Sequence, residues 1–456
     1  MKYLRTESGQ VLPSILALML MLSALGVALA AIAVSNNRSA SQLQKSQSAF
    51  NIAEAGINYY LWHLSHNSTD YTDGSATIPG STPYGPYTHD YDNDAGTKIG
   101  TFSLYITPPV SNSTVTTVKS VGVALHGTGT RTVQAQLGIP SFASYALLTN
   151  SEIWFGPTES SNGPVLSNVG IRFDGTNDGP VESATSTYVP STASGTNGTT
   201  TEPGVWGTGG PQSQWQFPVP AVDFNQVTAD LQALQTSAQS NGVYLAPTGT
   251  FSASHGYEIV LKNNKTFDIY KVTNVVNGTP TTTFVRNQAA PANGLLYVAD
   301  NVWVQGTWNG RMTIASGRLP DVSSTDTTIT IIGNVSYTAL DGSVALGLIA
   351  QQDVDVSSIA PNNLTIDGAL LAQKGAVIYP YSGGIVKNNL TFYGSIATNQ
   401  QWTWNYVSCG SCTTVIDGYK TDTNTFDTNL TFSPPPSFPT TGAYSVLNWR
   451  ELLSNP

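Results

Sequence analysis

The two cysteines of the 456-residue chain lie close together, as Cys409 and Cys412 in the stretch YVSCGSCTTV. A structural metal site needs about four ligands, and the sequence has no second Cys-x-x-Cys pair to complete one. A redox-active pair normally begins a helix, but β-forming residues flank this pair on both sides. We therefore predict a structural disulfide at the tip of a hairpin, in an oxidising compartment outside the cytoplasm. A free thiol pair and a redox-active pair are the alternatives.

Three aspartates alternate in the stretch HDYDNDAG, as Asp90, Asp92 and Asp94 ahead of Gly96. Carboxylates at alternate positions before a glycine resemble half of a calcium loop. The glutamate that would close an EF-hand is missing, because position 101 is Thr101. Calcium is therefore the one candidate cofactor, and an ordinary Asp- and Asn-rich turn is the alternative.

Carboxylates also give the best case for catalysis. Asp353 and Asp355 alternate on one expected strand and Asp367 lies on the next. Such groups could cleave glycosidic bonds if two of them stood about 5–10 Å apart. A lyase would need a basic residue, for which the candidates are Arg311, Arg318 and Lys374. Because no established catalytic motif is present, we expect no enzyme activity. A membrane-anchored extracellular enzyme acting on polysaccharide is the alternative.

Aromatic residues provide a second kind of candidate site. Five of them lie among Asn, Gln and Thr, at expected strand edges and beside the cysteines: Trp303, Trp308, Trp402, Trp404 and Tyr406. Exposed Trp and Tyr rings beside amide side chains suit sugar rings or the surface of a partner. The alternative is that these rings pack against the body of their own domain.

The composition excludes one class of partner. Charged residues make up only 10 % of the chain, its net charge is −10, and it has no run of Lys and Arg. Nucleic acid is therefore not an expected partner, because nothing would displace counterions from phosphates. The hydrophobic share of 40 % is ordinary, so the chain can form cores.

A long helix is the first element that must position these groups. Behind a leader of residues 1–9, the stretch from Val11 to Val34 carries no charge and covers the roughly 20 residues that span a membrane. Residues 35–66 continue without proline as an amphipathic helix. The apolar stripe is predicted at Leu43, Phe50, Ala53, Ile57, Tyr60, Leu61 and Leu64. We predict one helix over residues 10–66, with signal-peptide cleavage at an Ala-x-Ala site (31–33) as the alternative.

This N-terminal segment resembles PilX-type pilin-like proteins of type IV pilus systems. The resemblance rests on a short basic leader, an uncharged helix and the stretch AFNIAEAGIN at 49–58. It implies that a prepilin peptidase cuts after Gly9 and leaves Gln10 as the N-terminus. It also implies that the helix lies in the cytoplasmic membrane before assembly and among other pilins in a filament afterwards. The residues it assigns to the assembly helix are Ser14, Phe50, Ala53, Glu54, Ala55 and Gly56.

One position departs from the pattern of major pilins. Those proteins carry Glu at the fifth mature position, where this chain has Ser14. The difference favours a minor or tip-proximal component over a repeating subunit.

The sequence pattern predicts mainly β-strands in the rest of the chain. Residues 67–140 contain three strand-like runs, which predict a small antiparallel, pilin-like sheet. Farther on, similar apolar segments recur, with Ala350, Ala372 and Ala397 spaced 22 and 25 residues apart. That spacing is typical of one coil of a parallel β-helix. We predict a right-handed parallel β-helix, with an antiparallel β-sandwich as the alternative.

We expect an inserted subdomain to interrupt the β-helix and the C-terminal segment to cover one of its ends. Its first rungs lie at 141–205, its main stack at 295–432, and an inserted α+β subdomain at 206–294. The subdomain should contain a helix from about Asp223, with Phe224, Val227, Leu231 and Leu234 on one face, and hairpin turns at 262–265 and 277–278. Residues 433–456 should form a Pro-rich strap and a terminal cap over one end, with Trp449 as a plug.

The predicted class is thus α+β, mainly β, and the predicted role is structural. We expect a single-pass protein of the cytoplasmic membrane with most of its chain outside, later part of a pilus-like filament on the cell surface. Its β-helix head would serve adhesion to a surface glycan or to a host or neighbouring cell.

Overall fold

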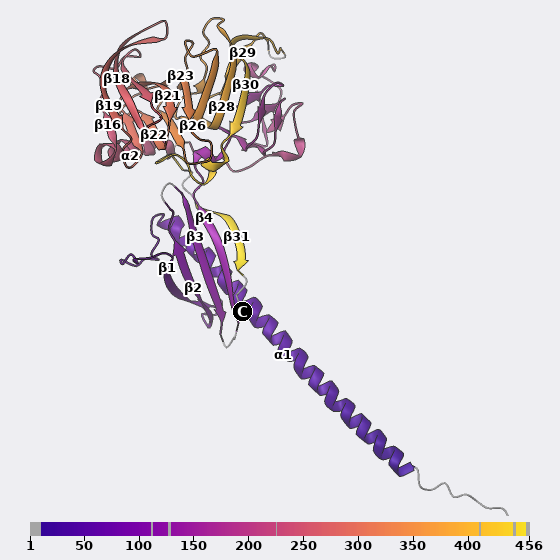
Figure 1. Cartoon of the computed structure of the whole chain (residues 1–456). Coiled ribbons are helices and arrows are strands. Elements are labelled where there is room, and N and C mark those ends of the chain that lie inside the picture. Colours follow the sequence, from indigo (N-terminus) through magenta and orange to yellow (C-terminus); the bar gives the residue numbers. More distant parts are fainter. Residues whose placement is uncertain are drawn as a thin grey trace, which may run out of the picture. The chain divides into compact units, whose positions relative to one another are not determined.

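The computed structural model describes residues 11–110, 113–125, 129–224, 226–409, 412–440 and 444–452. They form two compact units. The first unit takes the described residues up to Pro108, Thr116–Leu137 and those from Tyr444 on, and the second takes Pro109–Val115 and Gly138–Ala443. The second unit is therefore an insertion between the last two strands of the first (Figure 1).

The first unit consists of one helix and one sheet. Helix α1 runs from Val11 to His66, and the five-stranded sheet has the order β1-β2-β3-β4-β31. The strands are β1 (Tyr84–Asp92), β2 (Lys98–Thr107), β3 (Val115–Ala124), β4 (Thr130–Gly138) and β31 (Ser445–Leu452). The pairs β1–β2 and β2–β3 are antiparallel. The predicted long helix and antiparallel sheet are confirmed.

The second half of α1 docks on this sheet through a stripe of buried residues at helical spacing: Ala49, Ile52, Ala53, Ile57, Tyr60 and Leu64. Leu43, which the periodicity places in the same stripe, is 72 % exposed. The periodicity extends beyond the contact, because a sequence pattern does not show where along a helix the sheet ends.

Two glycines set the closeness of this contact. A Cβ on Gly56 of α1 would lie 2.2 Å from the hydroxyl oxygen of Ser120. A Cβ on Gly122 of β3 would lie 2.2 Å from the backbone oxygen of Ala49. At Gly122 the sheet therefore touches the backbone of the helix, and at Gly56 the helix touches the side chains of Ser120 and Phe102; a side chain at either glycine would separate them. This contact gives the Ala-Glu-Ala-Gly segment a physical role.

The second unit is built from stacked parallel strands. On one face the parallel ladder runs through β16 (Val243–Leu245), β20 (Leu295–Val298), β22 (Arg311–Ser316), β24 (Ala345–Ala350), β26 (Asn363–Ala372), β28 (Val386–Thr398), β5 (Leu147–Thr149), β8 (Val165–Ser167), β11 (Val181–Ser183) and β15 (Trp215–Gln216). Parallel pairing over so many strands is the arrangement of a β-helix and excludes an antiparallel sandwich.

Other ladders complete the coils. A second parallel ladder contains β17 (Gly256–Leu261), β21 (Asn301–Trp308), β23 (Ile329–Tyr337), β25 (Val354–Val356) and β27 (Val377–Ile378), and β30 (Val415–Phe426) adds to β28. The first coils supply β6 (Ile153–Phe155), β9 (Ile171–Phe173) and β14 (Val205–Trp206), with the short pairs β7 (Ser160–Ser161)–β10 (Thr176–Asn177) and β12 (Thr187–Tyr188)–β13 (Glu202–Pro203). The described interior is continuous across the coils.

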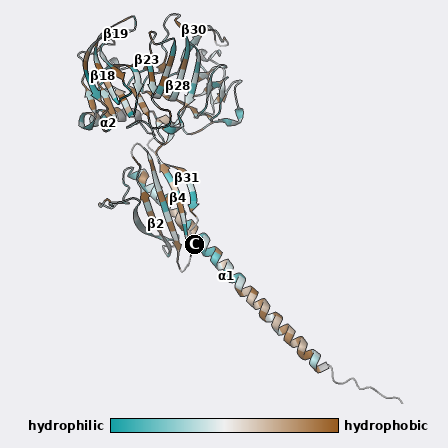
Figure 2. Ribbon diagram, viewed as in Figure 1, coloured by the Kyte–Doolittle hydropathy of each residue, from teal (hydrophilic) through white to brown (hydrophobic). Residues whose placement is uncertain are grey.

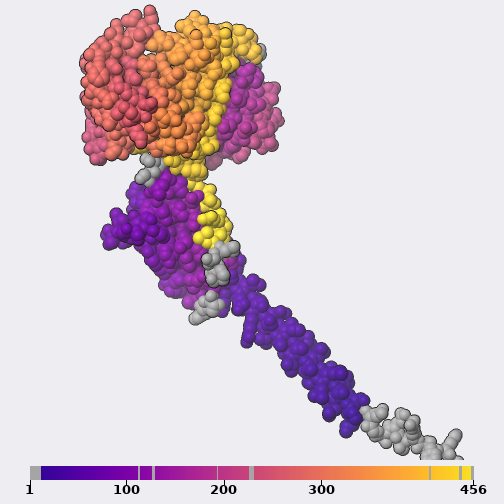
Figure 3. Space-filling model, viewed as in Figure 1, coloured from indigo at the N-terminus to yellow at the C-terminus, as the bar shows by residue number. Residues whose placement is uncertain are grey.

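The order of the coils in space differs from their order in the sequence. The first coils, from β5 to β15, stack on β28 at the far end of the main stack. Figure 3 shows this order on one face of the unit, from red through orange to yellow and then to the purple first coils. The sequence suggested that these rungs precede the main stack, because local repeats do not reveal which coil a given coil rests on.

The register explains the small residues of the repeat. Ala350 pairs with Ala372, as the repeat predicts, but Ala372 pairs with Thr398 and Ala397 pairs with Leu371. The corner ladder therefore contains small or hydroxyl residues, whereas Ala397 belongs to the adjoining ladder on the outer surface of the sheet.

Residues 206–294 do not form a separate subdomain. Strands β16 and β17 pair in parallel with β20 and β21, so this segment supplies a coil of the stack. The additions are helix α2 (Gln226–Asn241) and the hairpin of β18 (Thr266–Val276) and β19 (Thr279–Ala289). Leu231 and Leu234 of α2 pack with Phe224 against the outer surface of the first ladder. The side chain of Val227 lies outside the described residues.

The C-terminal segment divides between the two units. The guanidinium of Arg311 donates hydrogen bonds to the backbone oxygens of Ser433 and Pro434, and Phe438 is buried. The predicted strap is thus present but lies along the side of the coils. The predicted terminal cap is wrong, because β31 joins the sheet of the first unit and Trp449 packs edge-on against Phe50 at 5.8 Å between ring centroids.

Candidate functional sites

The first half of α1 is a bare apolar surface. This half of the helix is mostly hydrophobic (Figure 2), and its large side chains from Leu12 to Val34 are exposed. By length and composition the helix could cross a membrane. Ser14 lies on this exposed part. Gly9 and Gln10, the predicted processing residues, lie outside the described residues.

The second half of α1 meets the last strand of the sheet. Arg131 of β4 pairs with the carboxylate of Glu451, donates to the hydroxyl of Ser46 at 2.7 Å and stands over the ring of Phe50 at 5.3 Å. The hydrogen bond from Arg131 lowers the pKa of Glu451. Glu54 lies beside Trp449 in a shallow surface depression. Phe50, Ala53, Glu54 and Gly56 thus all belong to the region where helix, sheet and β31 meet, and Ala55 is half-buried.

The three alternating aspartates do not converge. Asp90 and Asp92 lie on β1, and Asp90 pairs with Lys98. The side chain of Asn93 accepts from the backbone N–H groups of Ala95 and Thr97, which makes this segment an ordinary turn. Among the residues that the structure describes, no group of three acidic, His or Cys side chains could hold a metal.

Four of the five candidate surface aromatics are buried. Trp303, Trp308, Trp402 and Trp404 are each at most 5 % exposed, so the prediction of exposed platforms is wrong for them. Trp303 is covered by Val272 of the β18–β19 hairpin, which the sequence could not place over this coil. Tyr406 remains half-buried.

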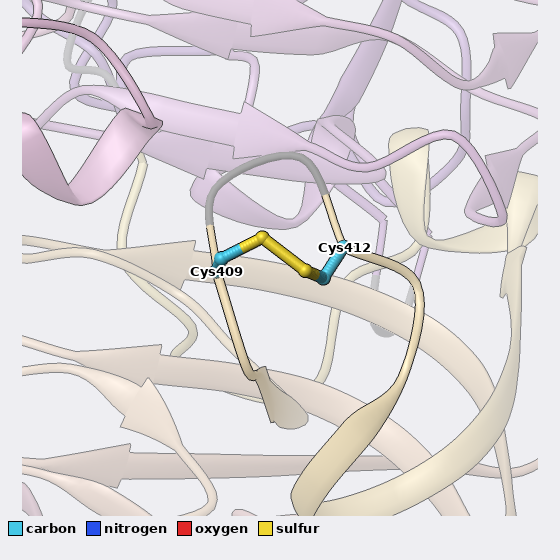
Figure 4. The surroundings of a disulfide bond; sticks show 2 residues. All are labelled: Cys409 and Cys412. Carbon is cyan, nitrogen blue, oxygen red and sulfur yellow. A yellow bond between two sulfur atoms is a disulfide. The ribbon is translucent and has the colours of Figure 1, made fainter.

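The cysteines are joined as predicted. The disulfide between Cys409 and Cys412 closes the tip of an antiparallel hairpin formed by β29 (Asn405–Val407) and β30 (Figure 4). The hairpin forms one wall of a cleft of about 300 Å³. The opposite wall is the loop after β6, and the described lining includes Trp154, Thr158, Glu159, Gln401, Trp402, Asn405 and Tyr406.

Glu159, in the lining of this cleft, has a second carboxyl group near it, that of Asp422. Burial and the nearby charge of Asp422 raise the pKa of Glu159 well above its usual value, and burial raises the pKa of Asp422 to about 6. The amide of Asn424 donates to Asp422 and accepts from the indole N–H of Trp404 at 3.0 Å. The charged form of Glu159 is therefore disfavoured. No sequence pattern points to this pair, because its members are 263 residues apart in a chain whose coils stack out of order.

None of the three carboxylates considered for catalysis is among the described residues that line this cleft. Asp353 accepts from the backbone N–H of Ala376, and Asp367 accepts from that of Tyr337. Asp355 lies in the β23–β25–β27 ladder, whereas Asp367 pairs with Tyr393 in the β26–β28 ladder.

The three candidate bases also have partners. Arg311 holds the strap, Arg318 donates to the backbone oxygen of Gly249, and Lys374 pairs with Asp321 and Asp326.

Asp355 makes the stability of the chain depend on pH. Burial and the charge of Asp353 raise the pKa of Asp355 to about 8, against about 3.9 in the unfolded chain. The folded state therefore holds this proton across a window in which the unfolded state has lost it, so stability falls as pH rises from about 4 to about 8. We expect Asp355→Asn to stabilise the chain by about 1–2 kcal/mol at pH 8 and to have much less effect at pH 5.

Denaturant unfolding of the full chain at the two pH values measures this effect. Asp94→Asn, at an exposed turn, is the matched control and should change neither midpoint. An equal effect of Asp355→Asn at both pH values would contradict the prediction.

Comparison with known proteins finds a family match in helix α1. Residues 11–58 match the family model described as PilX N-terminal. Among solved structures, the chain is similar to the crystal structure of the competence-associated pilin ComZ from Thermus thermophilus. That match has a TM-score of 0.30 and 12 % identity, and covers 90 % of this chain and 98 % of that chain. No curated protein sequence matches this chain significantly.

Proposed function

We propose that this chain, a pilin-like protein with a PilX-type N-terminal segment, is a minor or tip-proximal component of a type IV pilus-like filament that displays its second unit for adhesion. The helix is its assembly device, and other pilins are its partners. Before assembly the helix holds the chain in the cytoplasmic membrane, with the sheet of the first unit and the whole second unit on the outer side.

The bare apolar half of α1 is the observation that carries this proposal. Over one continuous helix, the residues from Ala49 on are buried against the chain's own sheet, whereas Leu12 to Val34 have no cover within the described chain. An exposed apolar surface of this length requires another apolar environment. A bilayer supplies that environment first, and the helices of neighbouring pilins supply it afterwards.

The insertion of the second unit supports a display role. Because β31 returns to the sheet next to β4, the main part of the second unit, Gly138–Ala443, is joined to the first unit at both of its ends. The side chains of Arg131 and Phe50 hold β31 in place through Glu451 and Trp449. The exposed apolar half of α1, from Leu12 to Val34, is the part of the helix that is available for assembly.

The mature N-terminus tests the proposal. We expect mass spectrometry of the chain from its native cells to find Gln10 as the first residue. Gly9→Val should block this cleavage, because the substituted residue is the one after which the peptidase cuts. Ala33→Val, at the alternative Ala-x-Ala site, is the matched control and should change nothing. A chain that begins at Met1 or at Val34 would refute the proposal.

The filament position is tested by stoichiometry. In sheared, purified filaments, quantitative mass spectrometry should find this chain far below the amount of the main subunit. A ratio near one to one would show that it is the repeating subunit.

A further inference from the structure

We propose that the cleft beside the disulfide hairpin binds one uncharged sugar unit of a surface glycan. This inference rests on the display role proposed above and gives that role a site and a class of ligand. The cleft lies between the loop after β6 and the β29–β30 hairpin, and its volume of about 300 Å³ is at the lower end of the range of ligand sites.

Two buried polar atoms at this cleft have no partner in the described chain. The indole N–H of Trp402, a residue only 5 % exposed, has no acceptor, and one carboxyl oxygen of Glu159 has no hydrogen-bond partner among the described residues. Both residues line the cleft. Leaving such groups unpaired costs about 1–3 kcal/mol each. A hydroxyl group is both donor and acceptor, so a ligand hydroxyl would pair with either group once its side chain turns toward the cleft.

The charge of the lining favours an uncharged ligand. Among its described residues the cleft has no Lys, Arg or His, and its one acidic side chain is Glu159. Burial raises the pKa of this carboxyl well above its usual value, and the charge of Asp422 adds to the effect. An acidic sugar would therefore find no cation, and a basic sugar would meet a carboxyl group whose charged form is disfavoured. A neutral ring with hydroxyl groups meets neither penalty.

The shape and chemistry of the walls favour a sugar over other neutral ligands. Trp154 and Tyr406 give apolar ring surface, and Gln401, Asn405 and Thr158 give donors and acceptors around it. This combination suits a pyranose, which has apolar C–H faces and a rim of hydroxyls. The disulfide fixes the wall that carries Tyr406, so the site is preorganised.

Calorimetric titration of the full chain tests the inference. The chain is kept in a polyoxyethylene detergent, because alkyl glycoside detergents would compete as sugars. The probes are cellotetraose, chitotetraose and maltotetraose, with tetragalacturonate as the charged comparison. We expect at least one neutral tetrasaccharide to bind and tetragalacturonate not to bind.

Four variants locate the site. Glu159→Gln keeps a neutral hydrogen-bonding group and should retain affinity within about threefold, whereas Glu159→Leu should weaken binding about tenfold. Tyr406→Ala removes one wall and should also weaken binding about tenfold. Phe284→Ala, at an exposed ring on β19 outside the cleft, is the matched control and should bind as the unmodified chain does. The unfolding midpoint of each variant shows whether it is folded.

Three results would overturn the inference. The first is that no neutral probe binds at millimolar concentration. The second is that tetragalacturonate binds more tightly than the neutral tetrasaccharides. The third is that a neutral sugar binds, but Glu159→Leu and Tyr406→Ala leave its affinity unchanged. The mature N-terminus separates this failure from that of the proposed function. A chain that begins at Gln10 but binds no sugar refutes the cleft alone, and one that binds sugar but begins at Val34 refutes the filament role alone.

Discussion

Replacing Gly122 by valine is expected to detach the second half of α1 from its sheet. A Cβ at this position would lie 2.2 Å from the backbone oxygen of Ala49 and 2.5 Å from the backbone nitrogen of Ala53. Backbone atoms of a helix cannot move aside as a flexible side chain can, so the helix must shift as a whole. We expect a loss of about 3 kcal/mol or more, at or above the upper end of the usual cost of overpacking.

Hydrogen exchange followed by mass spectrometry measures this loss in the full chain in detergent. The amides of residues 49–64 should lose protection in Gly122→Val, while those of the second unit keep theirs. Gly80→Val is the matched control, because a Cβ on Gly80 would meet nothing within 4 Å. Unchanged protection of residues 49–64 would show that helix and sheet are farther apart than the structure has them.

The consequence for function follows from the same contact. The helix can carry the sheet and the second unit into a filament only if they are fixed to the helix. The contact at Gly122 is where the sheet of the first unit packs on α1. Gly122→Val should therefore reduce the amount of this chain in purified filaments without changing cleavage after Gly9. Normal incorporation of the variant would contradict the role given to this contact.

Replacing Trp308 by alanine is expected to destabilise the second unit by about 3–5 kcal/mol. Trp308 is 0 % exposed and belongs to the continuous interior of the coils, with Phe267 at 6.5 Å between ring centroids. Removing the indole leaves a cavity that neighbouring coils cannot fill, because their strands are held by ladder hydrogen bonds on both sides.

Denaturant unfolding measures this change. It also tests whether Trp308 is buried, as the structure has it, or exposed, as the sequence suggested. An exposed Trp308 that served as a binding platform would change the free energy of unfolding little when truncated. Phe284→Ala is the matched control, since the ring of Phe284 is 55 % exposed on β19, and it should cost less than about 1 kcal/mol. Equal effects of the two substitutions would contradict the burial of Trp308.

The sequence by itself determined the elements that depend on local order. The uncharged run from Val11 to Val34 predicted a helix of membrane-spanning length, and together with the leader and the stretch AFNIAEAGIN it carried the resemblance to PilX-type pilin-like proteins. Alternating strands predicted the small sheet, recurring apolar segments predicted parallel coils, and the spacing of Cys409 and Cys412 predicted a closed hairpin. Each of these features is a pattern of near neighbours, which side-chain size, charge and hydrogen bonding fix within a few residues.

Only the tertiary structure shows which segments that are distant in the sequence pack against one another. A strand has two faces, and the sequence does not tell which of them a distant segment covers. From the sequence, Trp303 was therefore predicted to be a surface ring, whereas in the structure the β18–β19 hairpin covers it. The same holds for β31, whose partner strand β4 precedes it by more than 300 residues of inserted chain. Glu159 and Asp422 become neighbours only because the first coils stack on β28 beside β30. Burial then changes their ionisation, a property that depends on the surrounding dielectric and not on residue type.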